Sequence, residues 1–157
     1  GGEVFMMPPG GQGSTYRYVG ARAAATGDGW ESLGDMGYMD AEGYLYLVDR
    51  RSDMVVTGGS NVYPAEVEAA LDSHPNVHSS AVIGLPDDDL GQRVHAIVEA
   101  RPPVDEEELR KYLAEYLVRY KIPRTFEFAD QPLRDDAGKL RRSKLREDRI
   151  AKQNTNQ

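Results

Sequence analysis

The chain has 157 residues, 39% of them apolar, and a formal net charge of -7. This length allows one compact domain with a smaller appended segment, and the acidic balance argues against a general nucleic-acid-binding protein, which needs clustered positive charge to neutralise phosphates. The absence of cysteine excludes disulfides and thiolate metal sites, and His74, His78 and His95 lack the spacing of a metal site.

Two further features limit the class of protein. No apolar run approaches the roughly 20 residues of a membrane-spanning helix, and no signal peptide opens the sequence, so we expect a cytoplasmic protein without a membrane span. Positive charge is concentrated near the end, where residues 139–152 contain seven Lys or Arg and two acidic residues. An anionic ligand at this segment is therefore compatible with the acidic total.

The opening segment predicts a short strand over residues 3–7 and then a loop rich in Pro and Gly. This segment is too small to form a hydrophobic core by itself. Aromatic and β-branched residues predict two strands, over residues 44–48 and 54–57. The charged residues 49–53 between them predict a turn. A change of backbone direction would be least costly there.

A helix is predicted to begin at Pro64, because proline suits the first helical position and the acidic residues after it favour the positive end of the helix dipole. This helix should end near residues 73–75. Residues 77–85 and 94–100 then predict two strands, joined by a turn-rich segment.

A second helix is predicted to start near Asp105. Its apolar face, which we expect to be core together with Tyr120, consists of Leu109, Tyr112, Leu113, Tyr116 and Leu117. A third strand over residues 125–128 and a basic helix over residues 140–151 complete the pattern. The alternation of strands and helices predicts an α+β fold, a small mixed sheet covered by helices, preceded by a short β segment.

Several residues have both a functional and a purely structural interpretation. The glycine pair Gly58-Gly59 precedes a helix, so its N–H groups could face a phosphate, but paired glycines more often form a tight turn. The spacing of a P-loop is absent. The segment therefore predicts no triphosphate-binding loop of its own.

Lys139 follows the turn-forming residues 135–138, which places it near a loop tip. A flexible ammonium there could stabilise charge that develops between a phosphate and a carboxylate, although a solvated lysine at a helix start is the simpler interpretation. Asp35 could bind a ribose diol or cap a turn, and Arg50 could be a ligand contact or part of a solvated turn. His74, near a helix end, is expected to complement the helix dipole.

Three motifs occur in the order that is typical of one enzyme family. They are WESLGDMGYMDAEGYLYLVDRRSDM, GGSNVYPAEVE and AGKLRRSKL, and they lie within residues 29–146. This arrangement resembles the mobile C-terminal domain of the acyl-CoA synthetases, in the adenylate-forming (AMP-binding) enzyme superfamily. The resemblance implies that residues 1–49 end a large N-terminal AMP-binding domain, that residues 50–53 are a hinge, and that residues 54–157 are the mobile domain.

The resemblance also implies a reaction. A carboxylic acid, commonly a fatty acid, reacts with ATP and Mg²⁺ to give an acyl-adenylate and pyrophosphate, and the thiol of coenzyme A then displaces AMP. The implied partners are the large N-terminal domain, the acid, ATP and coenzyme A, and no metal is held by the segment itself. The phosphate loop and acyl pocket of the family lie in that large domain, so this chain alone is expected to be inactive.

Site residues follow from the motifs position by position. Lys139 stands where the family keeps the lysine that bridges the carboxylate and the α-phosphate. Asp35 stands where the ribose hydroxyls are bound, and Arg50 where an arginine contacts the nucleotide. Gly58 and Gly59 correspond to the glycines that line the channel for the pantetheine arm, where the absence of Cβ atoms allows close approach.

Two more positions are implied contacts, and two depart from the pattern. Tyr120 and Arg124 lie in a region that in relatives touches the nucleotide of coenzyme A. Ser52 stands at the hinge, where the family usually has Asp or Lys, and Asp49 replaces the glycine before the family arginine. Serine can still absorb a change in φ and ψ.

Two other functions are compatible with the same motifs. An adenylation module that loads a carrier-protein phosphopantetheine uses the same lid, and a carrier domain downstream would distinguish it. A free-standing binding domain without catalysis is the other alternative. The opening GGEVFMM resembles the closing strands of the family's large domain, which disfavours a free-standing domain.

Overall fold

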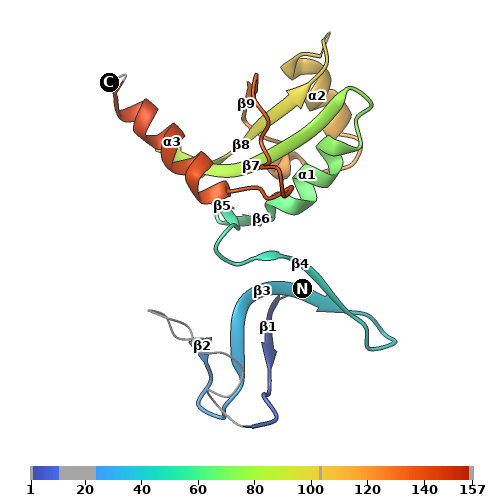
Figure 1. Ribbon diagram of the computed structural model, residues 1–157, viewed down its shortest axis with the longest axis vertical. Coiled ribbons are helices and arrows are strands. Elements are labelled where there is room, and N and C mark those ends of the chain that lie inside the picture. Colours follow the sequence, from blue (N-terminus) through green and yellow to red (C-terminus); the bar gives the residue numbers. More distant parts are fainter. Residues whose placement is uncertain (1, 11–23, 103, 156–157) are drawn as a thin grey trace. The chain divides into compact units, whose positions relative to one another are not determined.

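The computed structural model describes residues 2–10, 24–102 and 104–155, and the chain divides into two units, Gly1–Ser52 and Asp53–Gln157. The first unit is an antiparallel sheet (Figure 1). Its strands are β1 (Gly2–Met6), β2 (Ala24–Ala25), β3 (Glu31–Met39) and β4 (Leu45–Arg50). Strand β3 pairs with each of the other three strands and organises the sheet.

The sequence did not predict β3, because its glycines conceal the strand pattern. Gly37 is needed for close packing, since a Cβ atom there would lie 2.6 Å from the carbonyl oxygen of Tyr46 on β4. The expected turn at Asp35 is wrong, because this residue lies inside β3. Strand β4 continues to Arg50, so the turn covers only residues 51–53.

The first unit has little core of its own. Neither core cluster takes a member from the part of this unit that the structure describes. Its exposed large apolar side chains are Phe5, Met6, Met7, Trp30, Tyr38, Met39, Tyr44, Leu45, Tyr46, Leu47 and Val48. An apolar surface of this extent is typical of an interaction face.

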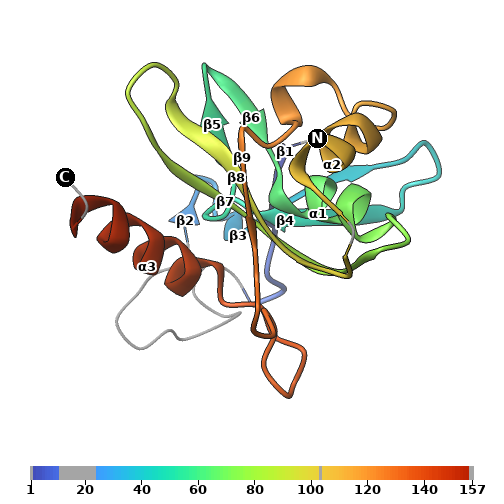
Figure 2. The same ribbon diagram turned by 90° about the horizontal axis from the view of Figure 1, so that it is seen from above.

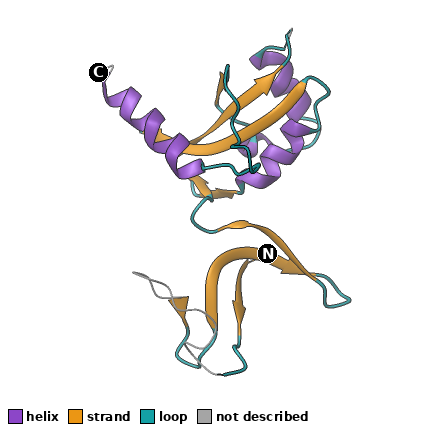
Figure 3. Ribbon diagram, in the orientation of Figure 1, coloured by secondary structure: helices purple, strands orange, loops and turns teal. Residues whose placement is uncertain are grey.

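The second unit is the expected α+β domain (Figure 3). Its elements are β5 (Val55–Thr57), β6 (Ser60–Val62), α1 (Pro64–Asp72), β7 (Val77–Asp87), β8 (Gly91–Ala100), α2 (Glu106–Leu113), the 3₁₀ helix η1 (Arg119–Lys121), β9 (Thr125–Phe128) and α3 (Arg142–Thr155). Strand β7 pairs antiparallel with β8, and β8 pairs parallel with β9. The predicted mixed sheet is confirmed, whereas β6, which forms a hairpin with β5, was not predicted.

Helices cover both faces of this sheet. One face packs against α1 and α2 through residues such as Val82, Leu71 and Leu109. The other face packs against α3 through residues such as Ile83 and Leu145. Because successive side chains of a strand point to opposite faces, coverage of both faces explains why β7 is buried without interruption from Ser79 to Leu85.

The helices begin as predicted, but α2 ends early. Pro64 is the first residue of α1, and the carboxylate of Asp105 accepts a hydrogen bond from the N–H of Glu108 at 2.8 Å, which caps α2. Because α2 stops at Leu113, the later tyrosines do not continue its buried face. The expectation that Tyr116 and Tyr120 are core is wrong, since they are 59% and 49% exposed.

Candidate functional site

Lys139 lies on a loop between β9 and α3 that closes on itself. The bridge between Arg134 and Leu140 joins the two arms, and Asp135 closes the turn, because its carboxylate accepts a hydrogen bond from the N–H of Lys139 at 2.9 Å. Gly138 has a φ of 74°, which only glycine adopts without strain. The backbone of Lys139 is therefore fixed while its side chain is exposed.

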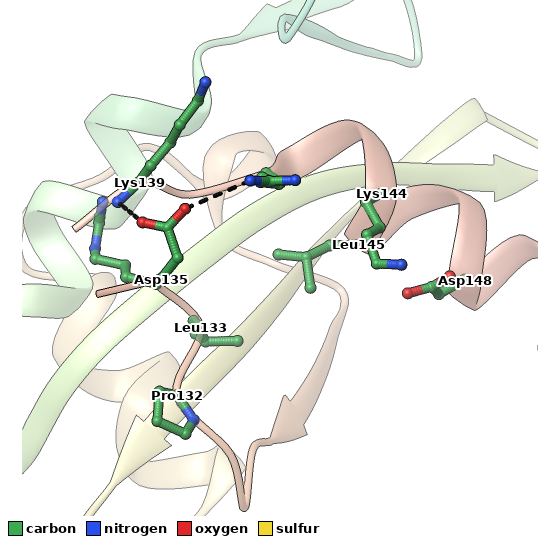
Figure 4. Close-up of a pocket in the computed structure, with 9 residues that line it drawn as sticks. Pro132, Leu133, Asp135, Lys139, Lys144, Leu145 and Asp148 are labelled. Atoms are coloured by element: carbon green, nitrogen blue, oxygen red, sulfur yellow. Dashed lines mark hydrogen bonds and ion pairs between the residues drawn. The ribbon is translucent and has the colours of Figure 1, made fainter. Parts of the chain in front are cut away.

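A cavity of about 240 Å³ lies beside this loop (Figure 4). Its lining combines apolar residues with charged ones, and consists of Pro132, Leu133, Arg134, Asp135, Lys139, Arg141, Lys144, Leu145 and Asp148. Figure 4 shows the ammonium of Lys139 extending away from Leu133 and Pro132. The lining contains four cationic and two acidic side chains, so the surroundings of Lys139 favour an anion.

Asp35 and Arg50 are brought together in the first unit. They are directly opposite each other on β3 and β4, and the Nε atom of Arg50 lies 3.9 Å from the Oδ1 atom of Asp35. The side chain of Arg50 is 74% exposed and that of Asp35 is 31% exposed. A long, exposed ion pair of this kind is weak, so both groups are available to a ligand that offers hydroxyls and a phosphate.

Gly58 and Gly59 form the two-residue turn of the β5–β6 hairpin, since Thr57 pairs with Ser60. Their φ values of 54° and 78° match a type I′ turn, which needs positive φ at both central residues. The tight-turn interpretation is therefore confirmed. Gly59 faces open space, because a Cβ atom there would meet no heavy atom within 4 Å.

Arg124 and this glycine turn both contact the β7–β8 hairpin. Its guanidinium is 3.7 Å from Asp87, while the N–H of Gly58 donates to the carbonyl of Leu90 at 3.0 Å. Tyr120 lies nearby in sequence on η1 and is half exposed. The structure thus brings Arg124 and the glycine turn to one hairpin, and this group is separate from Lys139.

The two candidate groups of the second unit face different sides. In Figure 2 the β5–β6 hairpin turn and the loop between β9 and α3 project from opposite sides of the second unit. Ser52 is exposed and is the last residue of the first unit. The chain therefore passes from one unit to the other at the residue that the sequence assigns to the hinge.

Sequence reasoning missed a charged cluster next to the Lys139 loop. The guanidinium of Arg142 donates to both carboxylate oxygens of Glu68, at 2.5 and 3.0 Å, and to Asp53 at 3.2 Å. Glu68 is only 5% exposed and also accepts a hydrogen bond from the N–H of Val82 at 2.8 Å. The sequence could have indicated this cluster through the position of its residues in the motifs, because Glu68 ends the GGSNVYPAEVE motif and Arg142 lies inside AGKLRRSKL.

Two of the three histidines, His74 and His95, make contacts that are structural in character. Within residues 2–10, 24–102 and 104–155, no group of three or more His, Asp or Glu side chains is placed to hold a metal ion. His74 lies at the C-terminal end of α1, where its N–H donates to the carbonyl of Leu71, and the dipole interpretation stays a prediction. This residue is buried, its Nδ1 atom accepts a hydrogen bond from the N–H of Asn76, and its Nε2 atom lies 3.3 Å from Glu108 on α2.

His95 joins the sheet to α3. Its Nδ1 atom lies 2.7 Å from the hydroxyl of Thr125 and its Nε2 atom 3.5 Å from Glu127, and Arg149 of α3 donates to both oxygens of Glu127. Burial lowers the pKa of His95, although Glu127 opposes this, and Arg149 and Arg93 add to it. The hydrogen bond from Arg149 lowers the pKa of Glu127.

Lowered pKa values in the folded state predict acid sensitivity. The unfolded chain binds more protons than the folded chain below the ordinary histidine pKa near 6.5, so the free energy of unfolding should fall as the pH drops from 7 to 5. Glu127 adds a further loss below about pH 4.5. We expect a smaller fall between pH 7 and 5 in His95→Gln, measured by urea unfolding of this chain.

The matched control is His78→Gln, which removes an exposed imidazole from the same sheet. It should retain the wild-type fall between pH 7 and 5. An equal fall in wild type and His95→Gln would contradict the assignment.

In the described residues, no helix is long and apolar enough to cross a membrane.

The family model of the AMP-binding enzyme C-terminal domain matches residues 66–139. The 2-succinylbenzoate--CoA ligase of Bacillus licheniformis is 44% identical over 144 residues, which are 92% of this chain and 30% of that protein. The chain thus spans less than a third of the length of this relative.

Solved structures of CoA synthetases are also similar to this chain. The o-succinylbenzoate CoA synthetase of Bacillus subtilis, in complex with its acyl-adenylate intermediate, is 42% identical, with a TM-score of 0.78 over 92% of this chain and 30% of that chain. The Mycobacterium tuberculosis fatty acyl CoA synthetase is 43% identical, with a TM-score of 0.69 over 82% of this chain and 26% of that chain.

Proposed function

This chain belongs to the AMP-binding, adenylate-forming enzyme superfamily and contains its C-terminal domain, and from that membership we propose that it is the lid of an ATP-dependent carboxylate–CoA ligase. The observation that carries the proposal is the arrangement of the second unit. The loop that carries the exposed Lys139 and the β5–β6 turn that carries Gly58 and Gly59 project from opposite sides of the second unit (Figure 2). Such a unit can complete a different catalytic set for each of two steps.

In the first step, a carboxylate oxygen of the acid attacks the α-phosphorus of ATP, and pyrophosphate leaves. Lys139 bridges the carboxylate and the α-phosphate, where its positive charge stabilises the negative charge of the transition state. Asp35 accepts hydrogen bonds from the ribose hydroxyls, and Arg50 contacts the nucleotide. Mg²⁺ accompanies ATP and partly neutralises its phosphates, which is supported by a related Bacillus subtilis synthetase in complex with ATP and a magnesium ion.

In the second step, the sulfur of coenzyme A attacks the acyl carbon, AMP leaves, and the thiol proton passes to solvent. The unit turns about residues 50–53, with Ser52 as the pivot, so that Gly58 and Gly59 replace Lys139 at the reaction centre. The hairpin turn leaves room for the pantetheine arm because neither residue has a Cβ atom. Arg124 and Tyr120 contact the nucleotide of coenzyme A.

The main partner is a large AMP-binding domain that precedes this segment in the same polypeptide. Its support is twofold: the chain spans about 30% of its relatives' length, and the first unit exposes apolar strands that lack a core. Residues 1–49 would complete the sheet of that domain. By itself the present chain would not catalyse either step.

The acyl pocket would belong to the large domain, so the acid is proposed from the relatives of this chain. Relatives with high coverage of this chain are named for 2-succinylbenzoate, and a fatty acyl CoA synthetase is equally similar over a shorter stretch. We therefore propose two candidate acids: a fatty acid, which the family resemblance suggests, and 2-succinylbenzoate, for which these relatives are named. Coenzyme A is favoured over a carrier protein because both kinds of relative are CoA ligases by name.

The test is ATP–pyrophosphate exchange by the longer protein that contains this chain, with 2-succinylbenzoate and with short and long fatty acids. Exchange that depends on one acid, followed by thioester formation with coenzyme A, is the expected result. Thioester formation only on a carrier protein would support the adenylation-module alternative. No exchange with any acid and no thioester would overturn the proposed function.

A further inference from the structure

We infer that Arg142 is a positioning residue, which holds the Lys139 loop in the orientation that the first step needs. The inference rests on the proposed function and adds a residue to it. Arg142 is three residues beyond Lys139 and is the first residue of α3. Its guanidinium makes the contacts to Glu68 and Asp53 given above, with 21% of the side chain exposed.

The Lys139 loop has a fixed shape, so its orientation depends on where its two arms are attached. Within the loop, Asp135 and the bridge between Arg134 and Leu140 fix the shape. The entering arm is attached at Leu133, whose N–H donates to Glu99 on β8 at 2.6 Å. The leaving arm is attached through Leu140, which packs against the core cluster that contains Ile83, and through Arg142.

The attachment at Arg142 is strong because its main partner is buried. Glu68 is 5% exposed, and a buried carboxylate requires a hydrogen-bonded cation. The planar guanidinium supplies two parallel donors to Glu68 and a third to Asp53. A lysine ammonium carries the same charge but cannot reproduce this fork.

The same guanidinium also reaches the start of the unit. Asp53 is the first residue of the second unit and follows Ser52 directly. Glu68 lies on α1, which follows the glycine turn. Arg142 therefore connects three parts of the unit: Asp53 next to the proposed hinge, helix α1 after the glycine turn, and the Lys139 loop. Lys139 consequently moves with the unit when the hinge turns.

The test uses Arg142→Lys in the longer protein. We expect a reduction of about 10- to 100-fold in kcat for adenylation, because a displacement of about 1 Å can have such an effect. The KM values for ATP and for the acid should stay unchanged. Thioester formation from preformed acyl-adenylate should also stay unchanged, since Lys139 does not serve that step.

A second measurement separates positioning from general damage. In a Lys139→Ala background, Arg142→Lys should cause no further loss of adenylation, because residues that act as one unit are not additive. Additive losses, or equal losses in both steps, would overturn the inference. A wild-type protein without any exchange would instead overturn the proposed function, so the two failures are distinguishable.

Two further variants serve as a matched control and as a substitute for Arg142→Lys. Arg149→Lys is the matched control, because Arg149 lies on the same helix and also donates to both oxygens of one carboxylate, that of Glu127; it should retain adenylation. If Arg142→Lys does not fold, Glu68→Gln keeps an acceptor for Val82 and weakens the same contact. It should show the same selective loss of adenylation, and loss of both steps alike would overturn the inference.

Discussion

Lys139→Ala in the longer protein is expected to reduce adenylation by about 10²- to 10³-fold, the range observed when one preorganised charge-stabilising donor is removed from an active site. The ammonium is exposed on a loop whose backbone is fixed by Asp135 and Gly138, so truncation removes a charge without disturbing the fold. In the proposed mechanism the second step does not use this lysine. Thioester formation from preformed acyl-adenylate should therefore remain near the wild-type rate.

Lys144→Ala is the matched control for this experiment. Lys144 lines the same cavity, so its removal lowers the local positive charge by the same amount. It should change adenylation by much less than Lys139→Ala does. Equal losses in the two variants would mean that the general field of this basic segment, rather than one placed ammonium, assists the reaction.

Gly59→Leu is expected to have the opposite selectivity. A Cβ atom at Gly59 meets no heavy atom of this chain within 4 Å, so the side chain would project into the space that we assign to the pantetheine arm. We expect thioester formation from preformed adenylate to slow by about 10²-fold, because small displacements of reacting groups have effects of this size. ATP–pyrophosphate exchange should persist.

Gly43→Leu separates this steric effect from backbone strain. Gly43 lies in the turn between β3 and β4 and has a φ of 90° against 78° at Gly59, and a Cβ atom there also meets nothing within 4 Å. Both variants place an L-residue in the left-handed region and should lose about 1–2 kcal/mol of stability. Only Gly59→Leu should slow the thioester step, and a similar slowing in Gly43→Leu would remove the case for a channel.

The sequence predicted the elements that have strong local signals. Pro64 marked the start of α1, Asp105 marked the cap of α2, and the apolar residues 81–85 marked β7. Strand β3 was missed because Gly37 serves close approach between strands, which local propensity does not express. The tyrosines after α2 were misplaced because the helix ended at Leu113.

For the candidate site, the motifs supplied residues but not their neighbours. Lys139, Gly58 and Gly59 were named from the sequence, and their local geometry follows from it, since glycines and Asp135 determine the turns. The cross-strand pairing of Asp35 with Arg50 depends on the register of β3 and β4. Register is a property of the whole sheet, and a shift of one residue would separate the pair.

The sequence by itself determined the family resemblance, the α+β class and the two turns, because these depend on residue types at short spacing. The tertiary structure alone decided which distant charges meet. Arg142 is 74 residues from Glu68 and 89 from Asp53, and Arg142 meets Glu68 only because α1 and α3 both pack against β7. Burial of Glu68 in that packing requires a cation beside it, and Arg142 is the residue that the fold places there.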